Sequence, residues 1–281
     1  MTETAWTRIS QIDRRWLFVS LWIVILLPYF VNVSLPMKIS TGTQDFYNYL
    51  KNMPKGSVIM WAWDVSFAGW SEMEAQGVAV TKLLFKMMRE KDCTIVIMGY
   101  REECGNLPER VLRELGMHPE QNPEYGKMYC HLGWLAGGAA GMANFAKNMR
   151  SVLPTDWWGT PLDKLPAMKD VNHIQDVDLV VYIESGGWEY VRNQYVVPYG
   201  TNLIVCSIAQ NVPGNMPMLD AGLCKAMLGG IRGGAELEIL TKELGVGNIN
   251  ITGISTTHLV LMAFMLIANV TYFMRKSKGE V

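Results

Sequence analysis

The sequence predicts a doubly wound α/β domain with a mainly parallel, five-stranded sheet, and three observations carry this prediction. Two apolar segments, residues 16–35 and 254–274, bracket the chain, and neither contains Asp, Glu, Lys or Arg. Between them, short apolar runs bounded by turns alternate with amphipathic stretches. Such runs are typical of parallel strands that are covered on both faces and joined by right-handed crossovers. We therefore expect a Rossmann-like domain over residues 36–253, flanked by an N-terminal and a C-terminal transmembrane helix.

The charges that flank the apolar segments predict an orientation. Each segment has roughly the 20 residues that a helix needs to cross the hydrocarbon core. Arg14 and Arg15 precede the first segment, and Arg275, Lys276 and Lys278 follow the second. Because positive charge collects on the cytoplasmic side, both tails, residues 1–15 and 275–281, are expected in the cytoplasm. The sequence thus predicts an integral protein of the cytoplasmic (inner) membrane with an extracytoplasmic domain.

Each apolar segment also has a simpler explanation. For the first, the alternative is a cleaved signal peptide, but its apolar stretch is longer than usual and no small-residue cleavage site follows. Pro28 within it is compatible with a membrane helix, where proline is better tolerated than in soluble helices. The second might be a buried core helix, which its length and basic tail disfavour. We expect two uncleaved anchors.

Five strands are expected in the domain, each a short apolar run. They cover residues 56–63, 93–99, 127–133, 178–184 and 202–209. A connector helix is expected at 43–53, and Ser71 with Glu74 has the spacing of a capping box for the helix after the first strand. Further helices are expected around 108–115, 138–149 and 188–195, with a long helical stretch from 218 to 244 that leads to the second span.

Composition excludes several classes of function. The net charge is −1, and no basic stripe interleaves with aromatic residues, so no nucleic-acid partner is expected. The five cysteines all lie in the middle domain and form no C-x-x-C pair, so neither a disulfide framework nor a zinc site is expected. The four histidines are too scattered for metal-ligand spacing, so no metal is expected.

Polar residues at the carboxyl ends of the strands are the candidates for a binding site. Ligands of open parallel sheets bind in the crevice beyond these ends. The candidates for ligand contact are Asp64, Ser66, Arg101, Glu184, Ser185, Gly186, Gln210 and Asn211.

Ser185 is the sharpest of these candidates, because two glycines follow it at a strand-to-helix turn. Three roles are open for Ser185: a helix-capping serine, a contact for an anion or ligand, or a nucleophile with His131 as base and Asp64 as orienting group. The G-x-S-x-G elbow is absent, since Ile183 occupies the position of its first glycine. The dinucleotide fingerprint also fails, because only Gly69 follows the first strand, so no cofactor is expected.

A second unusual segment is glycine-rich and is expected to be helical. Gly229 with Gly233, and Gly230 with Gly234, make two overlapping small-x-x-x-small pairs. Each glycine costs about 1 kcal/mol relative to alanine inside a helix, so a close contact is expected to compensate. The contact is either with the sheet of the same chain or with a second subunit above the membrane.

Two stretches resemble a known family. They are WWGTPLDKLPAMKDV with DVDLVVYIESGGWEYV, and PMLDAGLCKAMLGGIRGGAELE, and together they cover residues 157–238. They resemble an uncharacterised family of prokaryotic membrane-anchored α/β proteins. The resemblance implies an inner-membrane setting and an α/β domain, and it implies no activity and no catalytic residues.

Two functions follow as expectations. The first is a non-enzymatic subunit of a membrane assembly, in contact with the lipid bilayer, that self-associates or binds other membrane proteins or a small ligand. The second is a membrane-tethered hydrolase or transferase that uses Asp64, His131 and Ser185, which requires these three side chains to converge around one pocket.

Overall fold

The computed structural model describes residues 5–31 and 35–279 of the chain. The chain divides into two compact units. The main unit is Met37–Gly247, and the second unit combines the two ends, Met1–Pro36 and Asn248–Val281.

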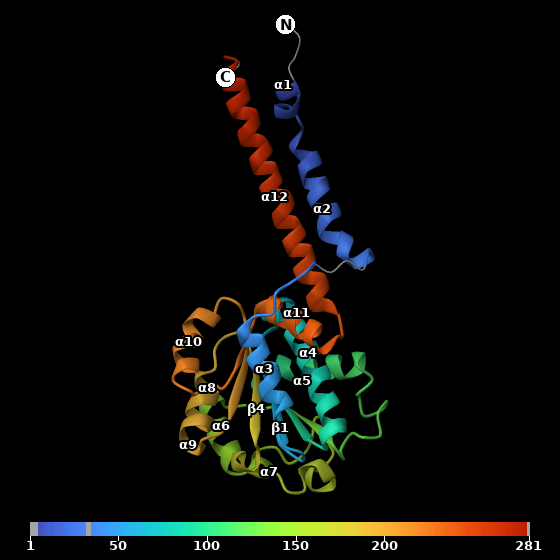
Figure 1. Cartoon of the computed structure of the whole chain (residues 1–281). Helices are drawn as coiled ribbons and strands as arrows, with labels where there is room; N and C mark the ends of the chain where they lie inside the picture. Colours follow the sequence, from blue (N-terminus) through green and yellow to red (C-terminus); the bar gives the residue numbers. More distant parts are fainter. Residues whose placement is uncertain (1–4, 32–34, 280–281) are drawn as a thin grey trace. The chain divides into compact units, whose positions relative to one another are not determined.

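The main unit is built around one sheet of six parallel strands (Figure 1). The strands are β1 (Val58–Asp64), β2 (Thr94–Gly99), β3 (Tyr129–Trp134), β4 (Leu179–Glu184), β5 (Leu203–Ser207) and β6 (Met227–Gly229). Their order in the sheet is β3-β2-β1-β4-β5-β6. This is the order of doubly wound α/β folds that contain two mononucleotide-binding halves. The predicted fold class, a parallel α/β sheet of Rossmann-like type, is therefore confirmed.

Helices cover both faces of the sheet, because successive side chains of a strand point to opposite faces and both sets are apolar. On β1, Trp61 and Trp63 point into the cluster made with the helices α3 (Thr41–Lys51), α4 (Phe67–Lys91), α5 (Glu103–Glu114) and α11 (Gly230–Thr241). Met60 and Ala62 point into the other cluster. The elements on this second face are α6 (Gly138–Lys147), α7 (Met149–Val152), η1 (Leu162–Lys164), η2 (Pro166–Met168), η3 (Ile174–Asp176), α8 (Glu189–Val191), η4 (Arg192–Val196) and α9 (Val197–Tyr199).

The five expected strands are all present, and a sixth corrects the count. β6 has three residues and lies within the stretch 218–244 that was expected to be helical. That stretch instead contains the end of α10 (Val212–Asp220), then β6, then α11. A strand of three residues is too short to show an alternating pattern, so periodicity cannot reveal it.

The start of the first long helix also differs from the expectation. α4 begins at Phe67, and its N-cap is Ser66, whose hydroxyl accepts a hydrogen bond from the Gly69 N–H at 3.2 Å. The Ser71–Glu74 spacing therefore lies inside the helix and caps nothing. Ser66 follows the strand after a single residue, Val65, so α4 begins close to the carboxyl end of β1.

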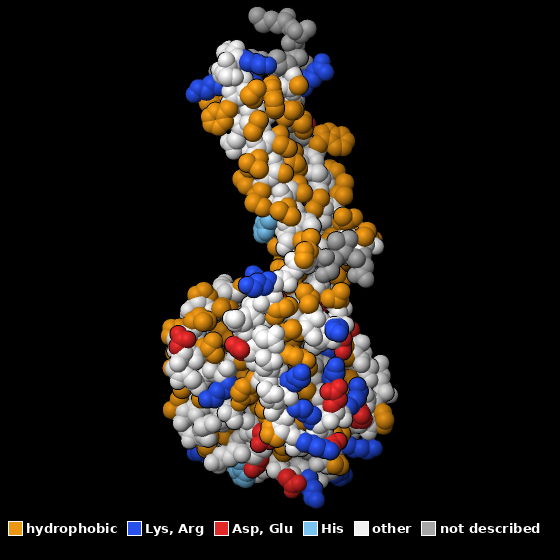
Figure 2. All heavy atoms as spheres, in the orientation of Figure 1, with side chains coloured by type: hydrophobic (Ala, Val, Ile, Leu, Met, Phe, Trp, Pro, Cys, Tyr) orange, Lys and Arg blue, Asp and Glu red, His pale blue; other side chains and the backbone are white. Residues whose placement is uncertain are grey.

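The second unit holds three helices among the described residues: α1 (Ala5–Ser10), α2 (Arg14–Phe30) and α12 (Val246–Ser277), the last of which begins two residues inside the main unit. Within the unit, the Tyr29 hydroxyl donates to Asn250 Oδ1 at 2.8 Å. Apolar side chains are exposed along both long helices, for example Phe30 at 83% and Leu266 at 67% (Figure 2).

One of these helices has the dimensions of a membrane span. In the part of the chain that the structure describes, α12 is the single helix that is both long and apolar enough to cross a bilayer. The expected N-terminal span, residues 16–35, does not form one helix of membrane-spanning length, because α2 ends at Phe30. Its 17 residues give a length of about 25 Å, against about 30 Å for the hydrocarbon core. Residues 32–34 of that expectation lie outside the described residues.

Two buried carboxylates of α11 hold neighbouring segments of the main unit. Glu236 accepts hydrogen bonds from the Ser40 N–H at 3.0 Å and from the Thr43 hydroxyl at 2.7 Å, so it fixes the start of α3. Burial alone would raise the pKa of Glu236, but the donors from Ser40, Thr43 and Arg232 together lower it. Glu238 accepts from the N–H groups of Gly245 and Gly247, both at 2.9 Å. Both carboxylates therefore stabilise neighbouring loops through hydrogen bonds.

Candidate functional site

Three polar side chains lie in register across the middle of the sheet, at its carboxyl edge. Asp64 of β1 pairs with Glu184 of β4, and Glu184 pairs with Ser207 of β5. By the alternation along each strand, all three point to the face that carries α6 and α8. β1 and β4 are neighbours from which the chain leaves to opposite faces, α4 to one and α8 to the other. In open α/β sheets, ligands bind at such a switch point.

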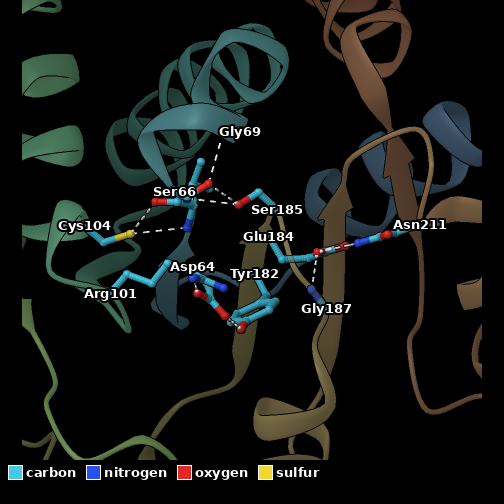
Figure 3. Close-up of polar contacts among 11 residues, drawn as sticks. Asp64, Ser66, Gly69, Arg101, Cys104, Tyr182, Glu184, Ser185, Gly187 and Asn211 are labelled. Atoms are coloured by element: carbon cyan, nitrogen blue, oxygen red, sulfur yellow. Dashed lines mark hydrogen bonds and ion pairs between the residues drawn. The ribbon is translucent and has the colours of Figure 1, made fainter.

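Asp64 is the centre of the first polar group. It is 6% exposed, and each of its carboxylate oxygens has a donor (Figure 3). Oδ1 accepts from Arg101 Nε in an ion pair, and Oδ2 accepts from the Tyr182 hydroxyl at 2.7 Å. Arg101 comes from the turn after β2, and Tyr182 lies two residues before the end of β4. Three neighbouring strand ends thus supply one hydrogen-bonded group.

A pocket of about 320 Å³ opens over this group. Its size is at the lower end of the range for small-molecule sites, about 300–1,000 Å³. Its polar walls are Asp64, Arg101 and Tyr182. Two aromatic residues, Tyr100 and Tyr190, and two apolar residues, Leu135 and Met142, form further walls. Gly138, the first residue of α6, completes the lining.

Two tyrosines of the pocket, Tyr100 and Tyr182, stay neutral over the ordinary pH range. Burial, with the adjoining Asp64 carboxylate, raises the pKa of Tyr182 well above its usual value. Burial also raises the pKa of Tyr100, whose hydroxyl donates to the Tyr195 hydroxyl at 3.0 Å. Neutral phenols here position their neighbours as hydrogen-bond donors, and they do not act as bases at neutral pH.

Glu184 is the centre of a second polar group, next to the first. It is fully buried, and it accepts hydrogen bonds from the Ser207 hydroxyl, from the Gly187 N–H at 2.6 Å and from Asn211 Nδ2 at 3.1 Å. Burial raises the pKa of Glu184, while these donors oppose the rise. Because its carboxylate oxygens accept hydrogen bonds from the loop after β4 and from the loop after β5, Glu184 connects these two loops at the carboxyl edge of the sheet.

Ser66 and Ser185 join the first turn of α4 to the end of β4. The Ser66 N–H donates to the Ser185 hydroxyl at 3.0 Å, and the Ser185 N–H donates to the Asp64 carbonyl oxygen at 3.0 Å. Gly69 permits this contact, since a Cβ at its position would lie 2.4 Å from the Cβ of Ser185. Of the readings proposed for Ser185, the geometry supports a structural contact at a helix start.

His131 is not part of this group, so the Asp64, His131 and Ser185 constellation does not assemble. His131 is fully buried on β3, and its Nε2 lies 2.8 Å from the carbonyl oxygen of Gly105 in α5. By the alternation along β3, it points to the α5 face, opposite to the face that Asp64 faces. Burial lowers the pKa of His131, which keeps the ring neutral.

The remaining predicted residues divide between the two polar groups and the surface. Asn211 belongs to the Glu184 group, and Gly186 lies against Arg101, because a Cβ at Gly186 would be 2.8 Å from Arg101 Nη2. Gln210 is exposed in the turn after β5. Among the described residues, no cluster of three or more His, Cys, Asp or Glu side chains could hold a metal ion.

Several residues of the site were missed by the sequence argument. Tyr182 had a usable signal, since it lies two residues before Glu184 and therefore on the same face of the same strand. Tyr100 and Leu135 directly follow β2 and β3, so they had the same strand-end signal as Arg101. Gly138, Met142 and Tyr190 had no such signal, because they reach the pocket only through the packing of α6 and α8 on the sheet.

The glycine-rich segment is used within the chain, which corrects the expectation of four helical glycines. Gly229 ends β6, Gly230 begins α11 with φ +57°, and Gly233 and Gly234 lie in its first turns. A Cβ at Gly234 would lie 2.7 Å from the carbonyl carbon of Ala75 in α4. At Gly234 the close approach is therefore that of α11 to α4 within the chain, and self-association through this segment stays a prediction.

Two other hollows of similar size lack the features of the switch-point pocket. One of about 340 Å³ is bordered by exposed charged side chains of α4, among them Lys86 and Arg89. The other, of about 410 Å³, lies between α3, α10 and α11, and its buried carboxylate, Glu236, already accepts hydrogen bonds from its own chain.

Comparison of the chain with protein-family models, with characterised proteins and with solved structures finds no match. The functional argument therefore rests on the residues and on the topology of the sheet. The resemblance of residues 157–238 to a membrane-anchored family stays a prediction.

Proposed function

We propose that this protein is a membrane-anchored ligand-binding subunit, with an α/β domain that takes a small molecule at the switch point of its sheet. The observation that carries the proposal is the pocket over Asp64, Arg101 and Tyr182, placed where β1 and β4 diverge. The base that such a hydrolase needs, His131 on β3, is separated by β2 and β1 from Ser185 at the end of β4, and backbone groups of their own surroundings contact both side chains, which favours binding over that chemistry.

The anchoring part of the proposal is supported by α12. Its apolar residues are exposed, and a continuous row of them is unusual on a protein surrounded by water. Arg275 and Lys276 lie in its last turn. The positive-inside rule then places the C-terminal tail in the cytoplasm and the main unit on the extracytoplasmic side.

Ligand binding predicts a rise in the thermal unfolding midpoint of the full chain in mild detergent, and the rise should grow with the ligand concentration. The midpoint is measured against a panel of amino acids, dicarboxylates, sugar phosphates, mononucleotides, nucleosides and monosaccharides, because a ligand at free concentration L that binds only the folded state stabilises it by RT ln(1 + L/Kd). Tyr190→Ser should weaken binding of the active compound by about fivefold, since a stacked aromatic wall contributes on the order of 1 kcal/mol.

Phe67→Ser is the matched control, because Phe67 is an aromatic residue of similar exposure, 62% against 56% for Tyr190, and does not line the pocket. This variant should bind as the wild type does. A panel in which no compound raises the midpoint, or in which Phe67→Ser and Tyr190→Ser weaken binding equally, would contradict ligand binding at this pocket.

The proposed orientation, with the main unit outside the cytoplasm and the C-terminal tail inside, predicts which added cysteines react with a membrane-impermeant maleimide in intact cells. The five native cysteines are buried and unpaired, so they provide a low background. Lys86→Cys, on the exposed surface of the main unit, should be labelled in intact cells, and Lys278→Cys should be labelled only after the cells are opened. Labelling in the opposite pattern would place the domain in the cytoplasm, and release of the chain by alkaline extraction would contradict anchoring.

A further inference from the structure

In the pocket at the switch point, the guanidinium of Arg101 has hydrogen-bond donors that the described part of its own chain does not use. Its Nε is used by Asp64, and the described contacts give its two terminal nitrogens no hydrogen-bond partner. The side chain is 40% exposed and lines the pocket. Arg232, in the hollow between α3 and α11, differs here, because its Nη2 donates to the carbonyl oxygen of Lys38 at 3.3 Å.

The position of Arg101 is fixed from two sides. Asp64, which is held in turn by the Tyr182 hydroxyl, orients the guanidinium through Nε. Gly186 leaves room for the terminal nitrogen Nη2, where a side chain would collide with it. A guanidinium held in this way presents two parallel N–H donors, a geometry that matches the two oxygens of a carboxylate or phosphate.

The start of α6 adds a second source of positive potential to the same pocket. Its first residue, Gly138, lines the pocket, and no atom lies within 4 Å of the position that a Cβ would take there. The N-cap is Gly137, which has no side chain to occupy the free N–H groups of the first turn. Such N–H groups and the helix dipole favour an anion at that place.

The rest of the pocket is suited to an apolar or aromatic body. The rings of Tyr100 and Tyr182 lie 6.0 Å apart between centroids and are tilted by 43°. The hydroxyls of both rings are engaged within the protein. Leu135 and Met142 complete this wall, so the ligand meets mostly carbon surface away from Arg101.

We propose that the pocket binds a small organic anion, whose carboxylate or phosphate group contacts Arg101 and the start of α6 and whose apolar body packs against the tyrosines. This inference rests on the proposed ligand-binding function and adds the chemical class of the ligand. Asp64 acts as a positioning residue that aims Arg101.

The test compares anions with neutral molecules that share their aromatic body, by isothermal titration calorimetry on the full chain. The probes are phenyl phosphate against phenol, and indole-3-acetate against indole-3-acetamide. At least one anion should bind about tenfold or more tightly than its neutral counterpart, as expected for charge-assisted hydrogen bonds. The pair that responds distinguishes a phosphate from a carboxylate.

Arg101→Gln should remove the preference for the anion and leave the neutral counterpart unchanged, whereas Arg110→Gln should change neither. Arg110 is the matched control, since it also forms an ion pair, with Glu74, on the exposed surface of α5. Arg101→Lys keeps the positive charge beside the buried Asp64 but lacks the parallel donors, so it should weaken anion binding by a smaller factor without loss of folding.

Equal binding of anion and neutral counterpart, or an Arg101→Gln variant that still prefers the anion, would overturn the inference. If a neutral compound of the wider panel binds and Tyr190→Ser weakens it, ligand binding stands and the anionic class is wrong. If no probe and no panel compound binds, both proposals fail.

Discussion

Replacing Gly234 with alanine is expected to lower the free energy of unfolding by about 1–3 kcal/mol, the range for overpacked interiors. The added Cβ would lie 2.7 Å from the carbonyl carbon and 2.8 Å from the Cβ of Ala75. Both atoms belong to the rigid part of α4, so α4 and α11 must separate to admit one methyl group. The measurement is urea-induced unfolding of the full chain in detergent, followed by tryptophan fluorescence.

Gly214→Ala is the control, because Gly214 also lies inside a helix, α10, but has open space where its Cβ would be. There alanine should stabilise the protein by about 0.5–1 kcal/mol, through its better helix propensity. Equal effects of the two substitutions would show that α11 does not pack on α4 in this way. A change of subunit number in Gly234→Ala, without loss of stability, would instead favour the intermolecular role of the glycines.

Removing the carboxylate of Glu184 is expected to cost about 3 kcal/mol, since a buried donor left without its acceptor costs about 1–3 kcal/mol. In Glu184→Ala, the Gly187 N–H, the Asn211 amide and the Ser207 hydroxyl all lose this acceptor. Glu189→Ala is the control, because Glu189 is exposed in α8, and it should change stability by less than about 0.5 kcal/mol. Similar losses in the two variants would contradict the role given to Glu184.

The same carboxyl group predicts a dependence of stability on pH. Burial raises the pKa of Glu184 in the folded state above its ordinary value of about 4.3. The stability that this shift contributes is therefore complete below about pH 4, and it is lost as the pH rises through the folded-state pKa. Relative to Glu184→Gln, which cannot ionise, the wild type should be more stable at acidic than at neutral pH. A difference that grows with rising pH would show that the donors outweigh burial.

The polar ends of the strands could be predicted in part. Asp64, Glu184 and Arg101 follow apolar runs in the sequence, and the structure brings them to one edge of the sheet. Their division into two groups could not be foreseen, because it depends on which loop donates to which oxygen. The sequence likewise places His131 at a strand end, but the face that it occupies follows from the register of β3, which only strand pairing sets.

The sixth strand and the glycine-rich segment likewise could not be predicted from the local sequence pattern. Methionine, leucine and glycine at 227–229 carry no period of two, and they become a strand because β5 offers a free edge. Once β6 is formed, Gly230 begins a helix directly from it and brings Gly234 against α4. The expected continuous helix over residues 218–244 is interrupted there, because pairing with β5 decides the local structure.

By itself, the sequence determined the α/β class, the five principal strands and the long apolar C-terminal helix, because each depends on the hydrophobic pattern of a continuous stretch of chain. The tertiary structure alone decided the strand order, the pairing of Asp64 with Arg101 and Tyr182, the separation of His131 from them, and the role of Gly234. These depend on contacts between residues far apart in the chain, which a local pattern does not encode.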